Sequence, residues 1–254
     1  MSHESDVSRE TVTPPAPPEA RGVFAIERLP LAEQYAAWLA DAGVVRGLIG
    51  PREVPRLWER HLMNCAALGG VLPEGATVAD VGSGAGLPGV VLAIARPDLR
   101  LTLIEPLLRR TTFLEEVAAA LGLDNVEVVR GRADLLHGKR TFDVVTSRAV
   151  APLGRLLEWS MPLVDPVGTL VAMKGSSVAE EIVAAREVLT RLGCSEPEVL
   201  TLDDGLSTTS AVAVAWADPT QVAWRISPRS SDRGSSRSGP TKTQKTQKDR
   251  RRSR

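Results

Sequence analysis

The stretch that decides the fold is TVADVGSGAGLPG, residues 77–89. Residues 77–81 form a short apolar run that predicts a buried strand, with Asp80 near its end. Four glycines follow at once, and the apolar run at 90–94 suits a helix packed on a sheet. A strand, a glycine turn and a helix in this order form the nucleotide-binding corner of a doubly wound α/β domain. Glycine is needed there because the backbone turns sharply and a ligand must approach it without a Cβ in the way.

The glycines can be aligned with two different cofactor motifs. Residues 84–89 match GxGxxG, the dinucleotide fingerprint, and Glu105 follows about 20 residues later. Asp80 and Gly82 instead begin a D-x-G-x-G-x-G pattern, with Gly84 as its second glycine. That pattern resembles the first motif of class I S-adenosylmethionine-dependent methyltransferases. Glu105 could accept hydrogen bonds from a ribose in either case, so an NAD(P)-dependent oxidoreductase remains the alternative function.

Composition limits the class of protein and its compartment. The chain has 254 residues, 43% of them hydrophobic, which is enough for one domain with a sizeable core. No uninterrupted apolar stretch approaches 18 residues, so we expect no membrane span. Cys65 and Cys194 are far apart and have no CxxC partner, so we expect no disulfide, no metal and a cytoplasmic protein.

The net charge of zero hides an asymmetry along the chain. Residues 228–254 contain ten basic and two acidic side chains, a net charge of +8. The rest of the chain therefore holds 21 of the 31 basic and 29 of the 31 acidic residues, a net charge of −8. An acidic body with a basic tail is a pattern that favours a nucleic-acid partner or a solvated tail with no function.

The chain divides into four expected parts. We expect a disordered tail over 1–28, a helical cap over 29–72, a methyltransferase domain over 73–218 and a disordered basic tail over 219–254. The cap should contain two helices, at 29–42 and about 53–68, because apolar residues recur there at helical spacing.

Beyond the glycine turn, strands and helices alternate, which predicts a parallel sheet with right-handed crossovers. Helices are expected at 109–121, 153–159 and 177–192. Strands are expected at 77–81, 100–104, 125–129, 142–146 and 168–173, with a closing hairpin at 198–202 and 210–216. Seven strands with a final hairpin suit the class I methyltransferase sheet better than the six-stranded dinucleotide fold.

Polar residues follow the predicted strands, where ligands of open α/β sheets bind. They are Asp80, Glu105, Asp134, Arg148 and Lys174. Asp134 is placed to meet an adenine amino group, and Arg148 follows the fourth strand, near where a substrate would lie. His61 in the second cap helix is a candidate group near the substrate or a half-buried helix histidine.

Missing motifs narrow the chemistry. No [ND]-P-P-[YF] motif and no cysteine follow the fourth strand, and HExxH is absent. A methyltransferase of this kind needs a substrate that is already a good nucleophile, such as guanine N7, which carries a lone pair and no proton. Alignment can then supply most of the catalysis, and no catalytic residue is identified.

The motifs together resemble the RsmG family, also called glucose-inhibited division protein B. They are DVGSGAGLPG at 80–89, SRA at 147–149, MKG at 173–175 and RHLMN at 60–64, and the resemblance covers about residues 30–216. It implies S-adenosylmethionine as cofactor and N7 of a guanine in 16S ribosomal RNA, free or in the small ribosomal subunit or its precursor, as substrate. We expect the protein to be a monomer. The cofactor contacts that the resemblance implies are Gly82, Leu87, Ala133, Asp134 and Arg148.

The chain departs from the family pattern at two places. Many members have aspartate where this chain has Glu105, a change that ribose binding tolerates. An asparagine-rich loop between the cap helices is replaced by GVVRGLIGPREV, residues 43–54, so RNA contacts there are not assigned. A cofactor-binding protein without catalysis, acting through its basic tail, is a third possibility.

Overall fold

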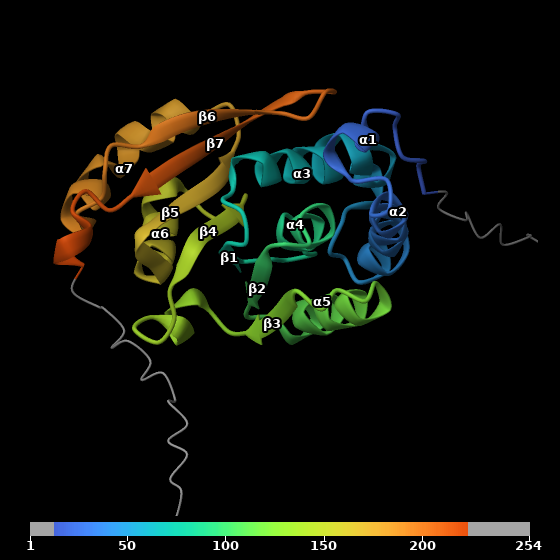
Figure 1. Ribbon diagram of the computed structural model, residues 1–254, viewed down its shortest axis with the longest axis horizontal. Helices are drawn as coiled ribbons and strands as arrows, with labels where there is room; N and C mark the ends of the chain where they lie inside the picture. The colour runs from blue at the N-terminus through green and yellow to red at the C-terminus, as the bar shows by residue number, and fades with distance from the viewer. Residues whose placement is uncertain (1–12, 223–254) are drawn as a thin grey trace, which may run out of the picture.

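One seven-stranded sheet runs through the protein, with strand order β3-β2-β1-β4-β5-β7-β6. The computed structural model describes residues 13–222 and is shown in Figure 1. Strands β1 to β5 pair in parallel, and β7 is antiparallel to both β5 and β6. The predicted class I methyltransferase sheet, with its closing hairpin, is therefore confirmed.

The strands lie close to their predicted positions. Their bounds are β1 Thr77–Val81, β2 Arg100–Glu105, β3 Val126–Arg130, β4 Phe142–Arg148, β5 Val164–Lys174, β6 Glu198–Asp203 and β7 Thr208–Ala215. β5 begins four residues earlier than the expected 168, and Gly168 lies where a Cβ would be only 2.7 Å from the Asp143 carbonyl oxygen. The glycine thus lets β5 pass close to β4, where the pairing shifts register between Phe142 and Val144.

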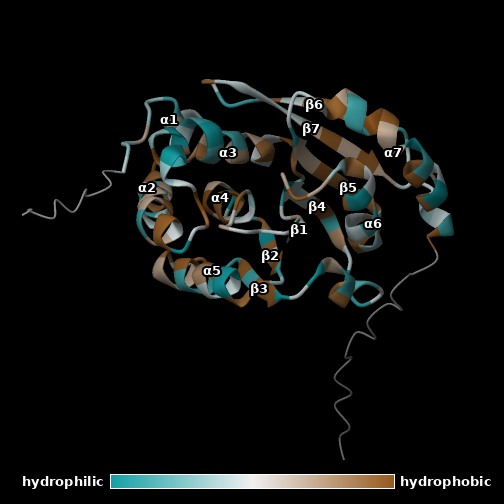
Figure 2. Cartoon of the chain, turned by 180° about the vertical axis from the view of Figure 1, so that it is seen from behind, coloured by the Kyte–Doolittle hydropathy of each residue, from teal (hydrophilic) through white to brown (hydrophobic). Residues whose placement is uncertain are grey.

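Helices cover both faces of the sheet because neighbouring residues of a strand point to opposite faces. Val78 joins a core cluster with α4 (Gly89–Ala95), α5 (Leu108–Ala120) and the cap. Ala79, the next residue, joins a second cluster with α6 (Leu153–Ser160) and α7 (Val178–Leu192). Figure 2 shows hydrophilic and hydrophobic residues alternating along α7, as expected of a helix with one face on the sheet.

The two predicted cap helices are present but irregular. The first consists of α2, Leu29–Trp38, continued by a wider π-helical turn over Leu39–Gly43. The second begins as a tight 3₁₀ turn over Pro51–Arg56, widens over Leu57–Met63 and ends as α3, Asn64–Leu68. Pro51 and Pro55 supply no N–H donor, which is why the regular α-helical pattern starts late.

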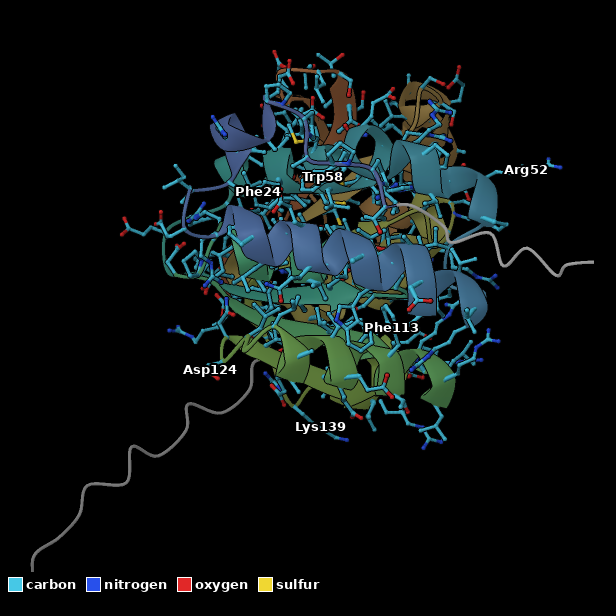
Figure 3. The ribbon with its side chains drawn as sticks, turned by 90° about the vertical axis from the view of Figure 1, so that its right-hand side faces the viewer. Phe24, Arg52, Trp58, Phe113, Asp124 and Lys139 are labelled. Carbon is cyan, nitrogen blue, oxygen red and sulfur yellow. The ribbon has the colours of Figure 1, made fainter. Side chains whose placement is uncertain are left out.

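Residues 13–28 correct the expectation of a disordered tail over 1–28. They include the short helix α1, Ala20–Val23, and Phe24 packs edge-to-face on Trp58 with ring centroids 6.3 Å apart. The Trp58 indole N–H donates to the Pro14 carbonyl at 3.0 Å. Figure 3 shows Phe24 and Trp58 close together beside the cap. The segment is ordered because Phe24 buries its ring against the cap, a partner that composition does not reveal.

The other predicted boundaries concern the C-terminal tail and the junction between the cap and the methyltransferase domain. Residues 219–222 pack at the end of the fold, with Val222 buried in the second core cluster. Residues 1–12 and 223–254, which include most of the two predicted tails, lie outside the described residues. A boundary between cap and methyltransferase domain near residue 72 stays a prediction.

Tyr35 connects the cap to the glycine turn. Its hydroxyl donates a 2.7 Å hydrogen bond to the Ala85 carbonyl, and the whole side chain is buried. Burial raises the pKa of the Tyr35 phenol well above its ordinary value, so the hydroxyl keeps its proton. The cap therefore fixes the backbone of the turn through a neutral hydrogen bond.

We predict that Tyr35→Phe lowers the free energy of unfolding by about 1–3 kcal/mol. The ring stays in place, but the buried Ala85 carbonyl loses its side-chain donor. Urea unfolding followed by circular dichroism measures the change. An unfolding midpoint equal to that of the unsubstituted protein would contradict the role given to this contact.

Candidate cofactor and substrate site

The glycine turn lies at the carboxyl edge of the sheet and has a left-handed backbone. The φ angles are +74° at Gly82, +59° at Gly84 and +99° at Gly86. Residues with a Cβ rarely adopt a positive φ. Glycine at positions 82, 84 and 86 is therefore a steric requirement of the turn. The N–H of Gly82 donates to the Ile104 carbonyl at 2.8 Å, which fixes the turn against β2.

Gly86 and Gly89 allow the helix after the turn to pack closely. A Cβ on Gly86 would lie 2.8 Å from the Tyr35 hydroxyl oxygen. A Cβ on Gly89 would lie 2.7 Å from Asp80 Oδ2 and still closer to the Leu103 side chain. These positions keep the N-terminus of α4 against β1 and β2, so its first N–H groups face the carboxyl edge.

Asp80 is fully buried beneath the turn. Its Oδ2 accepts a 3.0 Å hydrogen bond from the Gly89 N–H, whereas Oδ1 has no partner among the described residues. Desolvation raises the pKa of Asp80 to about 7, and the nearby Glu105 carboxylate adds to the rise. A buried carboxylate oxygen without a partner fits a cofactor that brings a cationic or N–H group, as the methionine part of S-adenosylmethionine does.

Glu105 ends β2 directly beside the turn. Its Oε2 accepts from the Gly84 N–H at 3.1 Å, and its Oε1 accepts from the Leu107 N–H at 3.0 Å. The Arg110 guanidinium also donates to Oε2 at 3.3 Å, although the Glu105 side chain is only 1% exposed. This carboxylate is held against the glycine turn, and its role as ribose acceptor stays a prediction.

The remaining predicted cofactor residues lie on loops of the same edge. Ala133 is buried and Asp134 exposed at the start of a 3₁₀ turn after β3, and Gly131 of that loop donates to the Glu105 carbonyl at 3.1 Å. Leu87 is half-buried within the glycine turn. Among residues 13–222 no hydrogen bond joins the Asp134 side chain to the rest of the site, so its adenine role stays a prediction.

Arg148, the last residue of β4, is turned towards the cap. Its guanidinium donates to the Arg60 carbonyl at 3.1 Å, to Cys65 Sγ at 3.3 Å and to His61 Nδ1. His61 Nε2 is in turn 3.0 Å from the Glu53 carboxylate. Desolvation and the Arg148 charge lower the pKa of His61 to about 4, so the imidazole is neutral at pH 7. The sequence identified His61 and Arg148 separately but gave no sign of Glu53.

Lys174, at the end of β5, is fully engaged in contacts with the loop and helix beside it, unlike Arg148 at the end of β4. Its ammonium pairs with Glu181 at 2.7 Å, donates to the Ala151 carbonyl at 2.8 Å and is only 6% exposed. Glu181 also accepts from the Leu153 N–H at 2.8 Å. Lys174 therefore holds the loop between β4 and α6 and is not a free cation for a ligand.

That loop closes over the glycine turn. Ala149 has φ +52°, a left-handed conformation that is costly for a residue with a Cβ. The next side chain, Val150, lies against Gly82, where an added Cβ would come within 2.8 Å of it. Costly backbone conformations of this kind concentrate at ligand sites.

Two hollows on the surface of residues 13–222 lie away from this site. Both are lined by residues at the amino ends of the strands, such as Ala76, Asp143 and Arg100. We assign the site to the carboxyl edge because the glycines, the buried acids and the helix N-terminus meet there. Within the described part of the chain no cluster of His, Cys, Asp or Glu could hold a metal ion, and no helix is long and apolar enough to cross a membrane.

Comparison with known proteins decides the family. The family model for rRNA small subunit methyltransferase G, GidB, matches residues 28–208. The chain belongs to this family. A ribosomal RNA small subunit methyltransferase G of Nocardioides sp. is 69% identical over 223 residues, covering 87% of this chain and 88% of the relative. The protein of the same name from Streptomyces coelicolor is 56% identical and covers 79% of this chain and 84% of the relative.

Structural similarity agrees with the fold. The crystal structure of cofactor-bound Rv0187 from MTB superposes with a TM-score of 0.53 at 19% identity, over 81% of this chain and 99% of that one. Family membership confirms the predicted methyltransferase class and S-adenosylmethionine as its cofactor. The oxidoreductase alternative receives no support.

We predict that Gly82→Ala weakens S-adenosylmethionine binding at least about tenfold, an effect of about 1.4 kcal/mol. The new methyl group would overlap the Val150 side chain that lies against Gly82, and the left-handed backbone would be strained by about 1–2 kcal/mol. Isothermal titration calorimetry measures the affinity.

Gly75→Ala is the matched control for that substitution. Gly75 has φ +66°, but a Cβ there meets nothing within 4 Å. Gly75→Ala should therefore carry the same backbone strain without the overlap with Val150, and it should leave the affinity unchanged. Equal affinities in both variants would rule out Gly82 as part of the cofactor site.

Proposed function

We propose that this protein transfers the methyl group of S-adenosylmethionine to N7 of a guanine in 16S ribosomal RNA, in the small ribosomal subunit or its precursor. The observation that carries the proposal is the family match over residues 28–208. Bound S-adenosylmethionine supplies an activated methyl group on a sulfonium centre. The protein has to bind it, hold the guanine in line with that methyl group and exclude water.

The polar groups of the carboxyl edge suit a reaction that needs no general base. Asp80 and Glu105 already accept backbone N–H groups, and His61 is neutral with both ring nitrogens engaged. Guanine N7 attacks with a lone pair and loses no proton, so the reaction does not require a general base at this edge. Positioning then carries the rate enhancement.

We assign the cofactor contacts to residues of this edge. Glu105 would receive the ribose hydroxyls, Asp134 the adenine amino group, and Asp80 and Gly82 the methionine part. Gly84, Leu87 and Ala133 would line the path between them, and Arg148 would contact the cofactor from the β4 side. These roles agree with the unpartnered Asp80 oxygen and with the position of Gly84, where a Cβ would meet only the Gly82 carbonyl oxygen at 3.8 Å.

Outside the basic tail, we expect RNA contacts on the cap. Arg52 extends away from the body in Figure 3, whereas Arg56 and Arg60 pair with Glu59 and Glu53 at 3.8 and 3.2 Å. Such exposed pairs are weak and can be exchanged for phosphate contacts. An N7 target must also be presented from an unpaired or locally opened segment. We further propose that the protein acts as a monomer in the cytoplasm, where its substrate is found.

We predict that the protein forms N7-methylguanosine in 16S rRNA and that His61 contributes no pH dependence to the rate between pH 6 and 8. His61 is already neutral throughout this range because the pKa of His61 is about 4. Small ribosomal subunits from cells lacking the gene are incubated with the protein and labelled S-adenosylmethionine. The modified nucleoside is then identified and mapped in the 16S rRNA. A rate loss near pH 6–7 that disappears in His61→Gln would overturn the base-free mechanism, and a product other than N7-methylguanosine would overturn the proposed target.

We predict that deleting residues 228–254 weakens RNA binding and flattens its salt dependence. The segment carries a net charge of +8, against −8 for the rest of the chain, and each phosphate contact releases counterions. S-adenosylmethionine affinity should not change. Binding of full-length and truncated protein to small subunits is compared at two salt concentrations. If full-length and truncated protein have equal affinities and equal salt dependence, the tail does not bind RNA and the cap arginines become the expected RNA contacts.

A further inference from the structure

A continuous series of polar contacts joins the surface of the cap to the end of β4. Glu53 lies in the 3₁₀ turn that opens the second cap segment, and His61 follows eight residues later. His61 contacts Arg148, which is 87 residues further along the chain. Arg148 would otherwise end a strand beside an exposed loop, so the cap side chains decide where its guanidinium points.

The donor and acceptor groups of Arg148, His61 and Glu53 permit only one arrangement of protons. A guanidinium can only donate, so His61 Nδ1 must accept from Arg148. The neutral imidazole then carries its proton on Nε2 and donates it to the Glu53 carboxylate at 3.0 Å. Glu53 thus fixes the tautomer of His61, and that tautomer offers its lone pair to Arg148.

The choice of a neutral acceptor has an electrostatic consequence. A carboxylate in the place of His61 would hold Arg148 equally well but would neutralise its charge. The other two acceptors of Arg148, the Arg60 carbonyl and Cys65 Sγ, are also uncharged. Burial raises the pKa of the Cys65 thiol, so it stays protonated. Arg148 is therefore oriented by three neutral groups and keeps its positive charge for a ligand.

We propose that His61, with its tautomer fixed by Glu53, is a positioning residue that directs the Arg148 guanidinium towards an anionic group of the bound cofactor. The methionine carboxylate of S-adenosylmethionine is the group whose chemistry fits. The inference rests on the proposed function, in which Arg148 contacts the cofactor. It assigns to the cap a part in cofactor binding in addition to covering the sheet.

The test is a double-mutant cycle on S-adenosylmethionine affinity, measured by calorimetry with the full-length protein. His61→Leu removes the acceptor and should weaken binding about tenfold, the scale of a charge-assisted hydrogen bond. His61→Gln keeps one acceptor and one donor and should restore most of the affinity. In the Arg148→Ala background His61→Leu should have no further effect, because residues that act as one unit are not additive.

The matched control replaces a neighbouring acid of the same segment. Glu59→Gln alters an exposed carboxylate that pairs only loosely with Arg56, and it should leave the affinity unchanged. Glu53→Leu, which frees the His61 tautomer, should weaken binding in the same direction as His61→Leu. Thermal unfolding of each variant shows whether the fold is retained, and His61→Gln keeps the test open if His61→Leu does not fold.

A pH series separates positioning from a purely structural role. The charged or titratable groups that face His61 are Glu53 and Arg60 from the cap, Cys65 from α3 and Arg148 from β4. The pKa of His61 is about 4 in the folded protein, below its ordinary 6.5, so protonation sets in as the pH falls towards 4. It replaces the lone pair that faces Arg148 with an N–H. Cofactor affinity should therefore fall more steeply below about pH 5 in the unsubstituted protein than in His61→Gln.

The outcomes separate the two proposals. Equal effects of His61→Leu with and without Arg148 would overturn positioning through Arg148, as would full affinity in His61→Leu when Arg148→Ala has lost affinity. If Arg148→Ala itself binds the cofactor normally, the placement of Arg148 at the cofactor is wrong and the inference falls with it. Loss of affinity in His61→Leu, recovery in His61→Gln and no additivity with Arg148→Ala would support it.

Discussion

The close approach of the α4 N-terminus to strands β1 and β2 is the constraint on which the rest of the structure depends. At Gly89 a side chain would overlap both Leu103 and Asp80. Because no side chain is present, the Gly89 N–H reaches the buried Asp80 carboxylate, and the first turn of α4 lies over the ends of the two strands. The left-handed glycines before it are what bring the chain round within a few residues.

This arrangement places two buried acids and a helix N-terminus around one small volume. The charge of Glu105 is compensated by two backbone N–H groups and Arg110, whereas Asp80 has one N–H and the Ser83 hydroxyl nearby. Complete burial is the main reason that the pKa of Asp80 rises to about 7, and the nearby Glu105 carboxylate adds to the rise. A cofactor that brings positive charge to the carboxyl edge would relieve the cost of ionising Asp80, so cofactor binding and the local electrostatics are matched.

The cap acts on this edge from two sides. Tyr35 of α2 bonds to the glycine turn, and His61 of the second segment bonds to Arg148 at the end of β4. Figure 3 shows α2 lying across the molecule above α5, with Phe113 between the two ribbons, and Phe113 packs edge-to-face on Trp38 at 6.1 Å. The apolar contacts hold the cap in place, and the two polar contacts then set the geometry of the site.

The sequence by itself determined the sheet, the glycine turn and the polar residues at the strand ends. These features depend on local periodicity and on backbone conformations that only glycine adopts readily, so they can be read from neighbouring residues. Tertiary structure alone decided the direction of the side chains. Lys174 and Arg148 both end strands, yet Lys174 pairs with Glu181 of α7 whereas Arg148 donates to His61 of the cap. Which acceptor each cation meets is decided by the packing of other elements against the strand ends. Residues 13–28 were misjudged for the same reason, since the partner of Phe24 is Trp58, more than thirty residues away. Contacts of this kind follow from packing, which no local pattern records.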